Sequence, residues 1–280
     1  MPTTSEKREA FRRLHDSGCF VLPNPWDVGS ARYLQGLGFK ALASTSSGAA
    51  WSLGAPDNGL TLDQAIAHIR SLVEATDLPV NADFEGGFAP DAEGVARHVA
   101  RCLATGVAAL SIEDSTGDAA RPLYDLSQAV ERLQAARAAV DEAGGGALLV
   151  GRAECFLTGH PDPLPEAIRR LRAYAAAGAD VLYAPGLRTR PEIAAVVEAV
   201  APKPLNVLAY PGMTVAELGE LGVRRISVGG ALARAAWGGF LRAAREIAET
   251  GSFQALGEAP PGRELNAFFA ADRERRRTRA

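Results

Sequence analysis

Carboxylates at the ends of two short apolar runs are the residues of this sequence best suited to do chemistry. The run at residues 79–87 carries Asp83 and Glu85 and then two glycines, and the run at residues 108–115 carries Glu113 and Asp114. Such runs are typical of buried parallel strands, whose C-terminal ends form active sites in α/β barrels and open sheets. Side chains alternate along an extended strand, so we expect Asp83 and Glu85 to point to the same side. Four carboxylates together favour a Mg²⁺-type or catalytic site over helix caps or solvated turn residues.

Hydroxyl groups and a glycine follow the predicted second strand, in the sequence Ser44, Thr45, Ser46, Ser47 and Gly48. Several converging hydroxyl and backbone N–H donors suit a carboxylate or phosphonate group. A polar turn that caps a helix explains the same pattern equally well. The segment therefore predicts either an anion site or a helix cap.

Three further polar residues follow predicted strands. Arg152 ends a buried strand and must be paired, so the neighbouring acidic strand ends are its expected partners, and it could also clamp an anion. Asn206 is either a polar group near the barrel mouth or a satisfied core amide. Cys155 could be a nucleophile, although a small buried side chain is the favoured interpretation.

The elements that must position these residues alternate between strand and helix patterns. Apolar β-type runs occur at residues 19–23, 41–44, 80–83, 109–113, 148–152, 181–184, 205–209 and 225–228. Helix-period segments lie between them, at residues 91–104, 126–143, 163–177, 191–200 and 215–221. Several junctions place a glycine where a helix C-cap needs a left-handed residue, at Gly38, Gly106, Gly178 and Gly222. Eight such units predict a (β/α)8 barrel, with a doubly wound open sheet as the alternative.

Length and composition restrict the class of protein. The 280 residues, 47% hydrophobic and 22% charged, fit a globular protein with one large domain. The net charge of −3 argues against nucleic acid as a main partner. Three distant cysteines indicate neither a disulfide framework nor a zinc site and fit a reducing cytoplasm. We expect no signal peptide and no membrane-spanning segment.

The last part of the chain lies outside the eight-unit count. We expect a barrel domain over residues 1–255 and a C-terminal extension over residues 256–280. The extension has an apolar segment at residues 264–270 and a basic tail at residues 273–279, which predicts a solvated or frayed end. The apolar segment predicts contact with the barrel or with another subunit, and hence a homo-oligomer, a dimer or tetramer.

Five segments in the correct order resemble the isocitrate lyase / phosphoenolpyruvate mutase superfamily. The resemblance covers roughly residues 8–250 and rests on residues 24–32, 44–57, 81–87, 111–115 and 151–154. It implies a (β/α)8 barrel, in which the last helix is often exchanged between subunits. It also implies Mg²⁺ or Mn²⁺ and a small 2-oxo or 2-hydroxy acid as substrate.

The resemblance also implies residue roles. Asp83 is similar to the direct metal ligand, and Asp57, Glu85 and Glu113 are similar to carboxylates that hold the metal directly or through its waters. Ser44, Thr45 and Ser46 fall where the family binds the substrate carboxylate, and Arg152 falls where it grips the oxyanion or second carboxylate. The expected catalytic residues are Arg152, Asp57 and Glu113, and the expected substrate-binding set is Ser44, Thr45, Ser46, Trp26, Asp83, Arg152 and Asn206.

The loop after the fourth strand departs from the family pattern. Residues 113–125 lack the cysteine-containing signature of isocitrate and methylisocitrate lyases, and they also lack the lysine and asparagine of the phosphonomutase gating loop. We therefore expect a Mg²⁺-dependent carbon–carbon lyase that acts on an oxaloacetate-, isocitrate- or methylisocitrate-type acid through a metal-stabilised enolate. Phosphonopyruvate or phosphoenolpyruvate mutase or hydrolase chemistry is the alternative. A non-catalytic barrel that binds 2-oxo acids is a further alternative.

Overall fold

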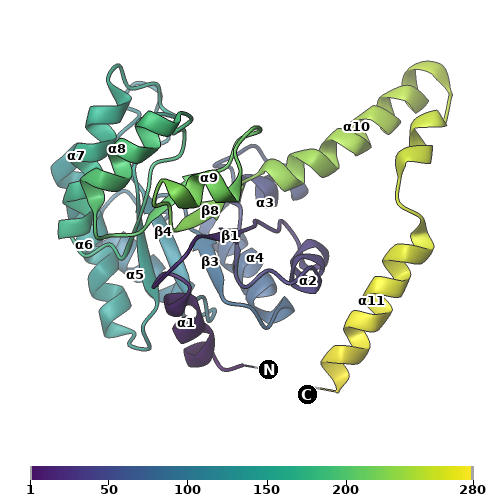
Figure 1. Cartoon of the computed structure of the whole chain (residues 1–280), viewed down its shortest axis with the longest axis horizontal. Helices are drawn as coiled ribbons and strands as arrows, with labels where there is room; N and C mark the ends of the chain where they lie inside the picture. The colour runs from purple at the N-terminus through teal and green to yellow at the C-terminus, as the bar shows by residue number, and fades with distance from the viewer. Residues whose placement is uncertain (1, 279–280) are drawn as a thin grey trace.

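The structure is a computed structural model that describes residues 2–278. Eight parallel strands form its centre (Figure 1). Their order around the sheet is β1-β8-β7-β6-β5-β4-β3-β2. The eight predicted runs are confirmed as strands, and β3, β4 and β5 have the predicted bounds. The strands are β1 (Phe20–Leu22), β2 (Leu42–Ala43), β3 (Val80–Asp83), β4 (Ala109–Glu113), β5 (Leu148–Arg152), β6 (Val181–Tyr183), β7 (Leu205–Leu208) and β8 (Arg225–Ser227).

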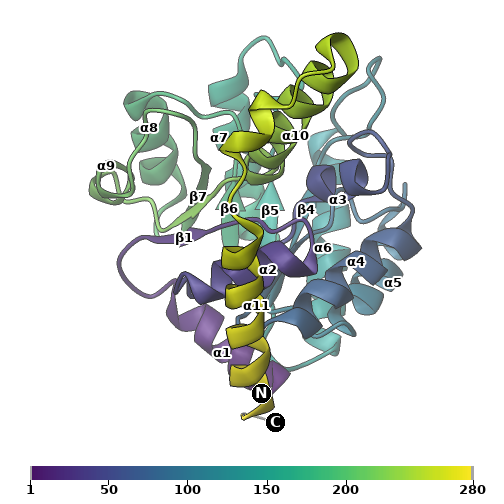
Figure 2. The same cartoon turned by 90° about the vertical axis from the view of Figure 1, so that its right-hand side faces the viewer.

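The sheet closes on itself between β1 and β2. The strand ladders run from β1 through β8 round to β2. Between the two end strands, the backbone N–H of Ala43 donates to the carbonyl of Pro23 at 3.1 Å. Helices cover the outside of this ring (Figure 2). The fold is therefore the predicted (β/α)8 barrel and not the open sheet.

The helices begin and end where the sequence supplies caps. Asp27, Thr61 and Asp91 accept hydrogen bonds from backbone N–H groups three residues on. The glycines of the repeated junctions have φ between +86° and +99°, where other residues are strained. The barrel helices are α1 (Thr4–Arg13), α2 (Val28–Gly36), α3 (Ser46–Ser52), α4 (Leu62–Ala75), α5 (Ala92–Leu103), α6 (Leu126–Glu142), α7 (Pro163–Ala176), α8 (Arg190–Val200) and α9 (Val215–Glu220).

Helix α1 covers the N-terminal end of the barrel. Phe11 is fully buried, and Arg8 donates from Nε to the carbonyl of Val107 at 2.9 Å. Lys7 donates from Nζ to the carbonyl of Thr76 at 2.6 Å. Lys7 and Arg8 of α1 thus donate hydrogen bonds to carbonyls at the N-terminal end of the barrel. The C-terminal end is left open for a functional site. Within the described residues, no helix is both long and apolar enough to cross a membrane.

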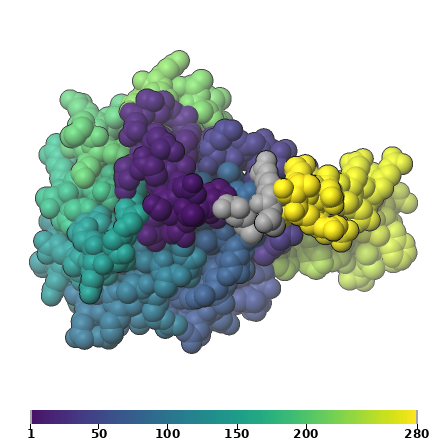
Figure 3. All heavy atoms as spheres, turned by 90° about the horizontal axis from the view of Figure 1, so that it is seen from below, coloured from purple at the N-terminus to yellow at the C-terminus, as the bar shows by residue number. Residues whose placement is uncertain are grey.

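The C-terminal part of the chain forms an arm that projects from the barrel (Figures 1 and 3). It consists of α10 (Ala231–Thr250), a 3₁₀ turn (Gln254–Glu258) and α11 (Gly262–Arg277). Helix α11 returns to α2, where the ring centroids of Phe268 and Tyr33 lie 4.7 Å apart. The predicted contact of the apolar segment with the barrel is therefore present within one chain. The basic tail is helical as far as Arg277, and Arg276 pairs with Asp272. Arg279 and Ala280 lie outside the described residues.

Candidate active site

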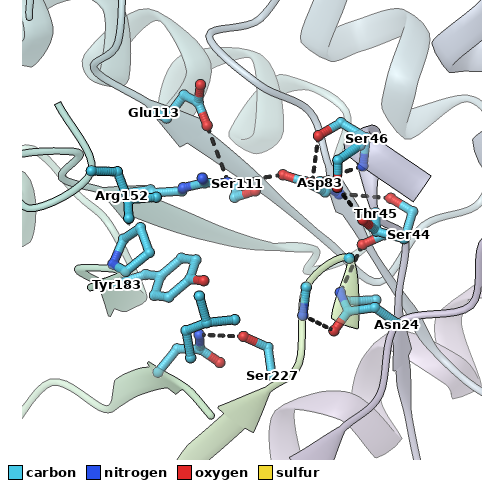
Figure 4. A pocket seen from close by; sticks show the side chains of 18 of the residues that line it. Asn24, Ser44, Thr45, Ser46, Asp83, Ser111, Glu113, Arg152, Tyr183 and Ser227 are labelled. Atoms are coloured by element: carbon cyan, nitrogen blue, oxygen red, sulfur yellow. Dashed lines mark hydrogen bonds and ion pairs between the residues drawn. The ribbon is translucent and has the colours of Figure 1, made fainter. Parts of the chain in front are cut away.

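A polar cavity of about 370 Å³ opens at the C-terminal ends of the strands (Figure 4). It is lined by the ends of β3, β4 and β5 and by the start of α3. The barrel therefore brings together side chains that are far apart in the sequence. The expected site residues that line the cavity are Ser44, Thr45, Ser46, Asp57, Asp83, Glu113, Arg152 and Asn206.

Asp83, the last residue of β3, is held by the serines that follow β2. Its Oδ2 accepts hydrogen bonds from the backbone N–H of Ser46 at 2.9 Å and from its hydroxyl at 2.8 Å. The backbone N–H of Asp83 donates to the hydroxyl of Ser44 at 2.8 Å. Thr45 is the N-cap of α3 and accepts from the N–H of Gly48. The segment is thus a helix cap that also orients a carboxylate, so one of its two predicted roles is seen directly.

Arg152, the last residue of β5, is paired with acidic strand ends as predicted. Its Nη1 lies 3.1 Å from Asp83 Oδ1 and 3.1 Å from Glu113 Oε2. Its Nε donates to Glu154, and its guanidinium lies 5.3 Å from the ring centroid of Tyr183. Burial lowers the pKa of Arg152, but these carboxylates outweigh burial and hold the pKa well above its ordinary value.

Glu154 is a site residue that the sequence reasoning missed. It is only 5% exposed, lines the cavity and pairs with Arg152. The signal was its spacing, because a residue two positions after a strand-end arginine can reach the same side of the sheet. The cavity is also lined by Ser111, Tyr183, Arg225 and Ser227, which were not predicted.

The cavity mouth carries more negative than positive charge. Burial raises the pKa of Glu113 well above its ordinary value, and Glu154, Asp83 and Glu85 add to the rise against the effect of Arg152. Burial and then Asp83 raise the pKa of Asp57. These carboxylates share one nearby arginine, so they resist ionising together.

Strand alternation does not extend to Glu85. The strand ends at Asp83 and Glu85 has φ of +47°, so the extended backbone on which the same-side expectation rests is absent at this residue. Glu85 lines an adjoining cavity of about 350 Å³ that shares Asn58, Glu113 and Ser115 with the first. Burial, Asp83 and Asp57 raise the pKa of Glu85 to about 7, and its buried Oε1 has no hydrogen-bond partner among the described residues.

Asp114 does not join the mouth carboxylates, contrary to the sequence prediction. It is 3% exposed and points into the barrel wall. Its Oδ2 accepts from Arg170 Nη1 at 3.0 Å and from the hydroxyl of Tyr174, and its Oδ1 accepts from the backbone N–H of Glu154 at 2.8 Å. Asp114 is therefore a structural anchor behind the site.

Three other expected residues are placed as follows. Asn206 accepts from Arg225 Nε at 2.8 Å and donates to the hydroxyl of Ser227 at 2.9 Å, which matches the satisfied core amide. Trp26 is not among the lining residues. Burial raises the pKa of the Cys155 thiol to about 12, which favours the structural interpretation of this cysteine.

The loop after β4 is folded back as a small hairpin. Ser115 and Leu123 form an antiparallel bridge, and the N–H of Thr116 donates to the carbonyl of Pro122 at 3.0 Å. Ser115 lines the cavity, and Tyr124 at the end of the loop is buried. The hairpin therefore borders the site and contributes a hydroxyl group to it.

The donor chemistry of the mouth fits a hard divalent cation. Carboxylate oxygens are the ligands that Mg²⁺ and Mn²⁺ prefer, and the cavity lining contains neither histidine nor cysteine. Within the described part of the chain, the buried Glu85 Oε1 has no hydrogen-bond partner, and burial together with neighbouring carboxylates raises the pKa values of Glu85 and Glu113, as expected where negative charge is in excess. Among residues 2–278, no group of three or more His, Cys, Asp or Glu is already spaced as a metal-ligand set.

The fold and the acidic mouth place the chain among barrel enzymes that act at the C-terminal ends of their strands. The family model for phosphoenolpyruvate phosphomutase matches residues 11–248, and the chain belongs to this family. It is therefore an enzyme of the isocitrate lyase / phosphoenolpyruvate mutase superfamily of carbon–carbon lyases and mutases, as the resemblance predicts.

Three relatives show the extent of the similarity. A crystal structure from Burkholderia cenocepacia J2315, provisionally described as a lyase/mutase, is 47% identical with a TM-score of 0.92 and covers 95% of this chain and 97% of that one. Oxaloacetate decarboxylase of Rhodopseudomonas palustris BisA53 is 32% identical over 98% of this chain and 92% of its own. A phosphonopyruvate hydrolase solved with oxalate and Mg²⁺ is 27% identical with a TM-score of 0.83, covering 96% of each chain.

Proposed function

We propose that this protein is a Mg²⁺- or Mn²⁺-dependent carbon–carbon lyase acting on a small 2-oxo or 2-hydroxy di- or tricarboxylate through an enolate. The observation that carries the proposal is the surplus of carboxylates around Arg152 at the mouth. This arrangement suits a cation and an anionic substrate together. The similarity to an oxaloacetate decarboxylase over nearly the whole chain supports it.

Asp83, Glu85, Glu113 and Asp57 would hold the cation, directly or through its water ligands. A bound cation supplies Lewis acidity toward the substrate's 2-oxo and carboxylate oxygens. Ser44 and Ser46 keep Asp83 in one orientation through the hydrogen bonds described above.

Arg152 stabilises the negative charge that develops on the substrate oxygen when the neighbouring carbon–carbon bond breaks. Its guanidinium remains charged because the surrounding carboxylates raise its pKa. The carboxylate of the substrate would lie against the start of α3, near Thr45 and Ser46. In the metal-free protein, burial raises the pKa values of Asp57 and Glu113, so these two carboxyls would give up their protons when the cation binds.

An oxaloacetate-type substrate places the least demand on the loop after β4. Loss of CO₂ needs no proton donor for the departing group, and this loop contains no cysteine, lysine or histidine. The alternative is phosphonopyruvate or phosphoenolpyruvate chemistry, supported by the similarity to phosphonopyruvate hydrolase.

Turnover assays with Mg²⁺, with and without EDTA, test the proposal. The substrates are oxaloacetate, isocitrate, methylisocitrate and phosphonopyruvate. Metal-dependent release of pyruvate or glyoxylate, lost in Asp83→Ala, supports the lyase. Release of phosphate from phosphonopyruvate supports the alternative. Binding of 2-oxo acids with no turnover on a wider panel would contradict both.

We also propose a homo-oligomer, a dimer or tetramer, in which helix α10 is exchanged between subunits. Trp237, Phe240 and Leu241 are exposed on α10 although they are large and apolar. An apolar groove of about 500 Å³ lies between Trp51 on α3 and Trp237 on α10. Analytical ultracentrifugation of wild type and Phe240→Glu tests this, since the variant should shift the protein toward monomer.

The free cysteines are consistent with a cytoplasmic location.

A further inference from the structure

The turn that follows β3 has a backbone conformation that requires external support. Glu85 and Phe88 have backbone φ of +47° and +56°, in the left-handed region that residues other than glycine rarely adopt. Gly87 between them has φ of +79°. A strained turn persists only where its surroundings hold it in place. The turn also carries Glu85, whose buried Oε1 has no hydrogen-bond partner among residues 2–278.

Arg132 of α6 supplies that support. Its Nη1 donates to the carbonyls of Ala89 and Pro90, both at 2.7 Å, and its Nη2 donates to the carbonyl of Gly86. Arg132 is 2% exposed, and the ion pairs found among the described residues do not include it. Burial lowers its pKa, and Tyr124 and the Asp91 carboxylate oppose that effect. A buried guanidinium is thus used on three carbonyls of one turn.

The same guanidinium contacts the loop after β4. Its central carbon lies 4.1 Å from the ring centroid of Tyr124, at the end of that loop. The carbonyl of Tyr124 accepts from Arg170 at 2.9 Å, which fixes this end of the loop. Arg132 therefore joins the turn after β3 to the anchored C-terminal end of the neighbouring loop.

We propose that Arg132 is a positioning residue: it holds the turn at residues 85–90 so that the Glu85 carboxylate lies in the cavity that it lines together with Glu113. It acts through Glu85 and takes no part in the reaction itself. The planar fork of arginine is required because two nitrogens must reach separate carbonyls, and a lysine ammonium cannot span them in the same way. The functional part of this inference rests on the proposed cation site.

Mn²⁺ binding to the full-length protein, measured by electron paramagnetic resonance, tests the inference without an activity assay. Arg132→Met should weaken Mn²⁺ binding about 10- to 100-fold, the range typical of residues that orient metal ligands. The variant Arg132→Lys should fall between Arg132→Met and wild type. Arg137→Met is the matched control, because Arg137 is on the same helix and pairs with Asp180 and Asp141 away from the turn.

A double-mutant cycle separates positioning from general structural damage. If Arg132 acts through Glu85, Arg132→Met should weaken Mn²⁺ binding no further in a Glu85→Gln background. Losses that multiply in the double variant, or wild-type Mn²⁺ binding by Arg132→Met, would overturn the inference. Thermal unfolding of each variant shows whether it is folded. If Arg132→Met is unfolded, the same Mn²⁺-binding measurements are made on Arg132→Lys.

Hydrogen exchange distinguishes failure of this inference from failure of the proposed function. In metal-free protein, Arg132→Met should exchange faster than wild type in a peptide covering residues 84–91, and Arg137→Met should not. Faster exchange without any Mn²⁺ binding by wild type would leave Arg132 as the support of the turn and would refute the cation site. Unchanged exchange would refute the role of Arg132.

Discussion

Two buried clusters of charge meet at neighbouring residues of one strand end and differ in their balance. Glu113 belongs to the mouth cluster, where it shares Arg152 with Asp83 and Glu154. Asp114, the next residue, belongs to a wall cluster in which Arg170 pairs with both Asp114 and Glu166.

The pKa shifts express this difference. At the mouth, burial and neighbouring carboxylates raise the pKa values of Glu113, Glu85 and Asp57. At the edge of the wall cluster, hydrogen bonds from exposed Arg169 and from Arg170 lower the pKa of Glu166 against the effect of burial. A cluster that stabilises the fold satisfies its own charges, whereas the mouth keeps a surplus that a cation or substrate can use.

The largest expected effect is on activity at the mouth. Asp83→Ala should reduce metal-dependent turnover by at least about a thousandfold, since it removes the carboxylate at the centre of the proposed cation site. The urea midpoint of the Asp83→Ala variant should stay the same or rise, because the substitution removes one negative charge from a cluster that has an excess of carboxylates. Exposed Asp63 on α4 provides the control Asp63→Ala, which should remain active. A fully active Asp83→Ala variant would contradict the claim that the mouth cluster serves activity.

The wall cluster should respond in the opposite way, through stability. Asp114→Ala leaves Arg170 buried with one acidic partner fewer and frees the Tyr174 hydroxyl. We expect the free energy of unfolding to fall by about 3–5 kcal/mol in urea titrations. Asp118→Ala in the exposed hairpin is the control and should cost little. A stable but inactive Asp114→Ala would assign this residue to the mouth instead.

The pH dependence of stability should differ in sign between the clusters. The pKa of Glu166 is lower in the folded chain than its ordinary 4.5. Its contribution is therefore present above about pH 4.5 and is lost as pH falls through the folded value. Glu166→Gln should be less stable than wild type by ~1 kcal/mol at pH 7, with a smaller difference in acid. Urea titrations from pH 3 to 7 measure this, with exposed Glu198→Gln as the control.

Glu85 should produce the opposite slope in metal-free protein. Its folded pKa of about 7 lies above its ordinary 4.5, so the folded chain binds the extra proton between these values. The free energy of unfolding from this group therefore falls as pH rises from 4.5 to 7. Glu85→Gln should remove that slope in the presence of EDTA. An unchanged slope would show that the mouth carries no charge surplus at Glu85.

The smallest effect is expected at Cys155, which lies beside the wall cluster. Its pKa of about 12 keeps the thiol protonated near neutral pH. Cys155→Ala should leave kcat/KM within about twofold of wild type, as for a small buried apolar side chain. A large loss of kcat without loss of stability would instead identify the thiol as part of the reaction.

Local signals in the sequence determined the barrel and most of the mouth. Apolar runs and helix caps depend on neighbouring residues, so the eight strands and the glycine junctions could be predicted from spacing alone. The strand ends of a parallel barrel meet at one face, and this rule alone is enough to bring Asp83, Glu113 and Arg152 together.

Only the tertiary structure decided how the charges are shared. Asp114 pairs with Arg170, 56 positions away, and Arg132 reaches Gly86, 46 positions away. Glu85 lies beyond the strand end and has a left-handed backbone, so strand alternation does not set the direction of its side chain. Alternation predicts direction only while the chain is extended. Beyond the strand end, each side chain is directed by the loop and by partners from distant helices, and no local pattern encodes them.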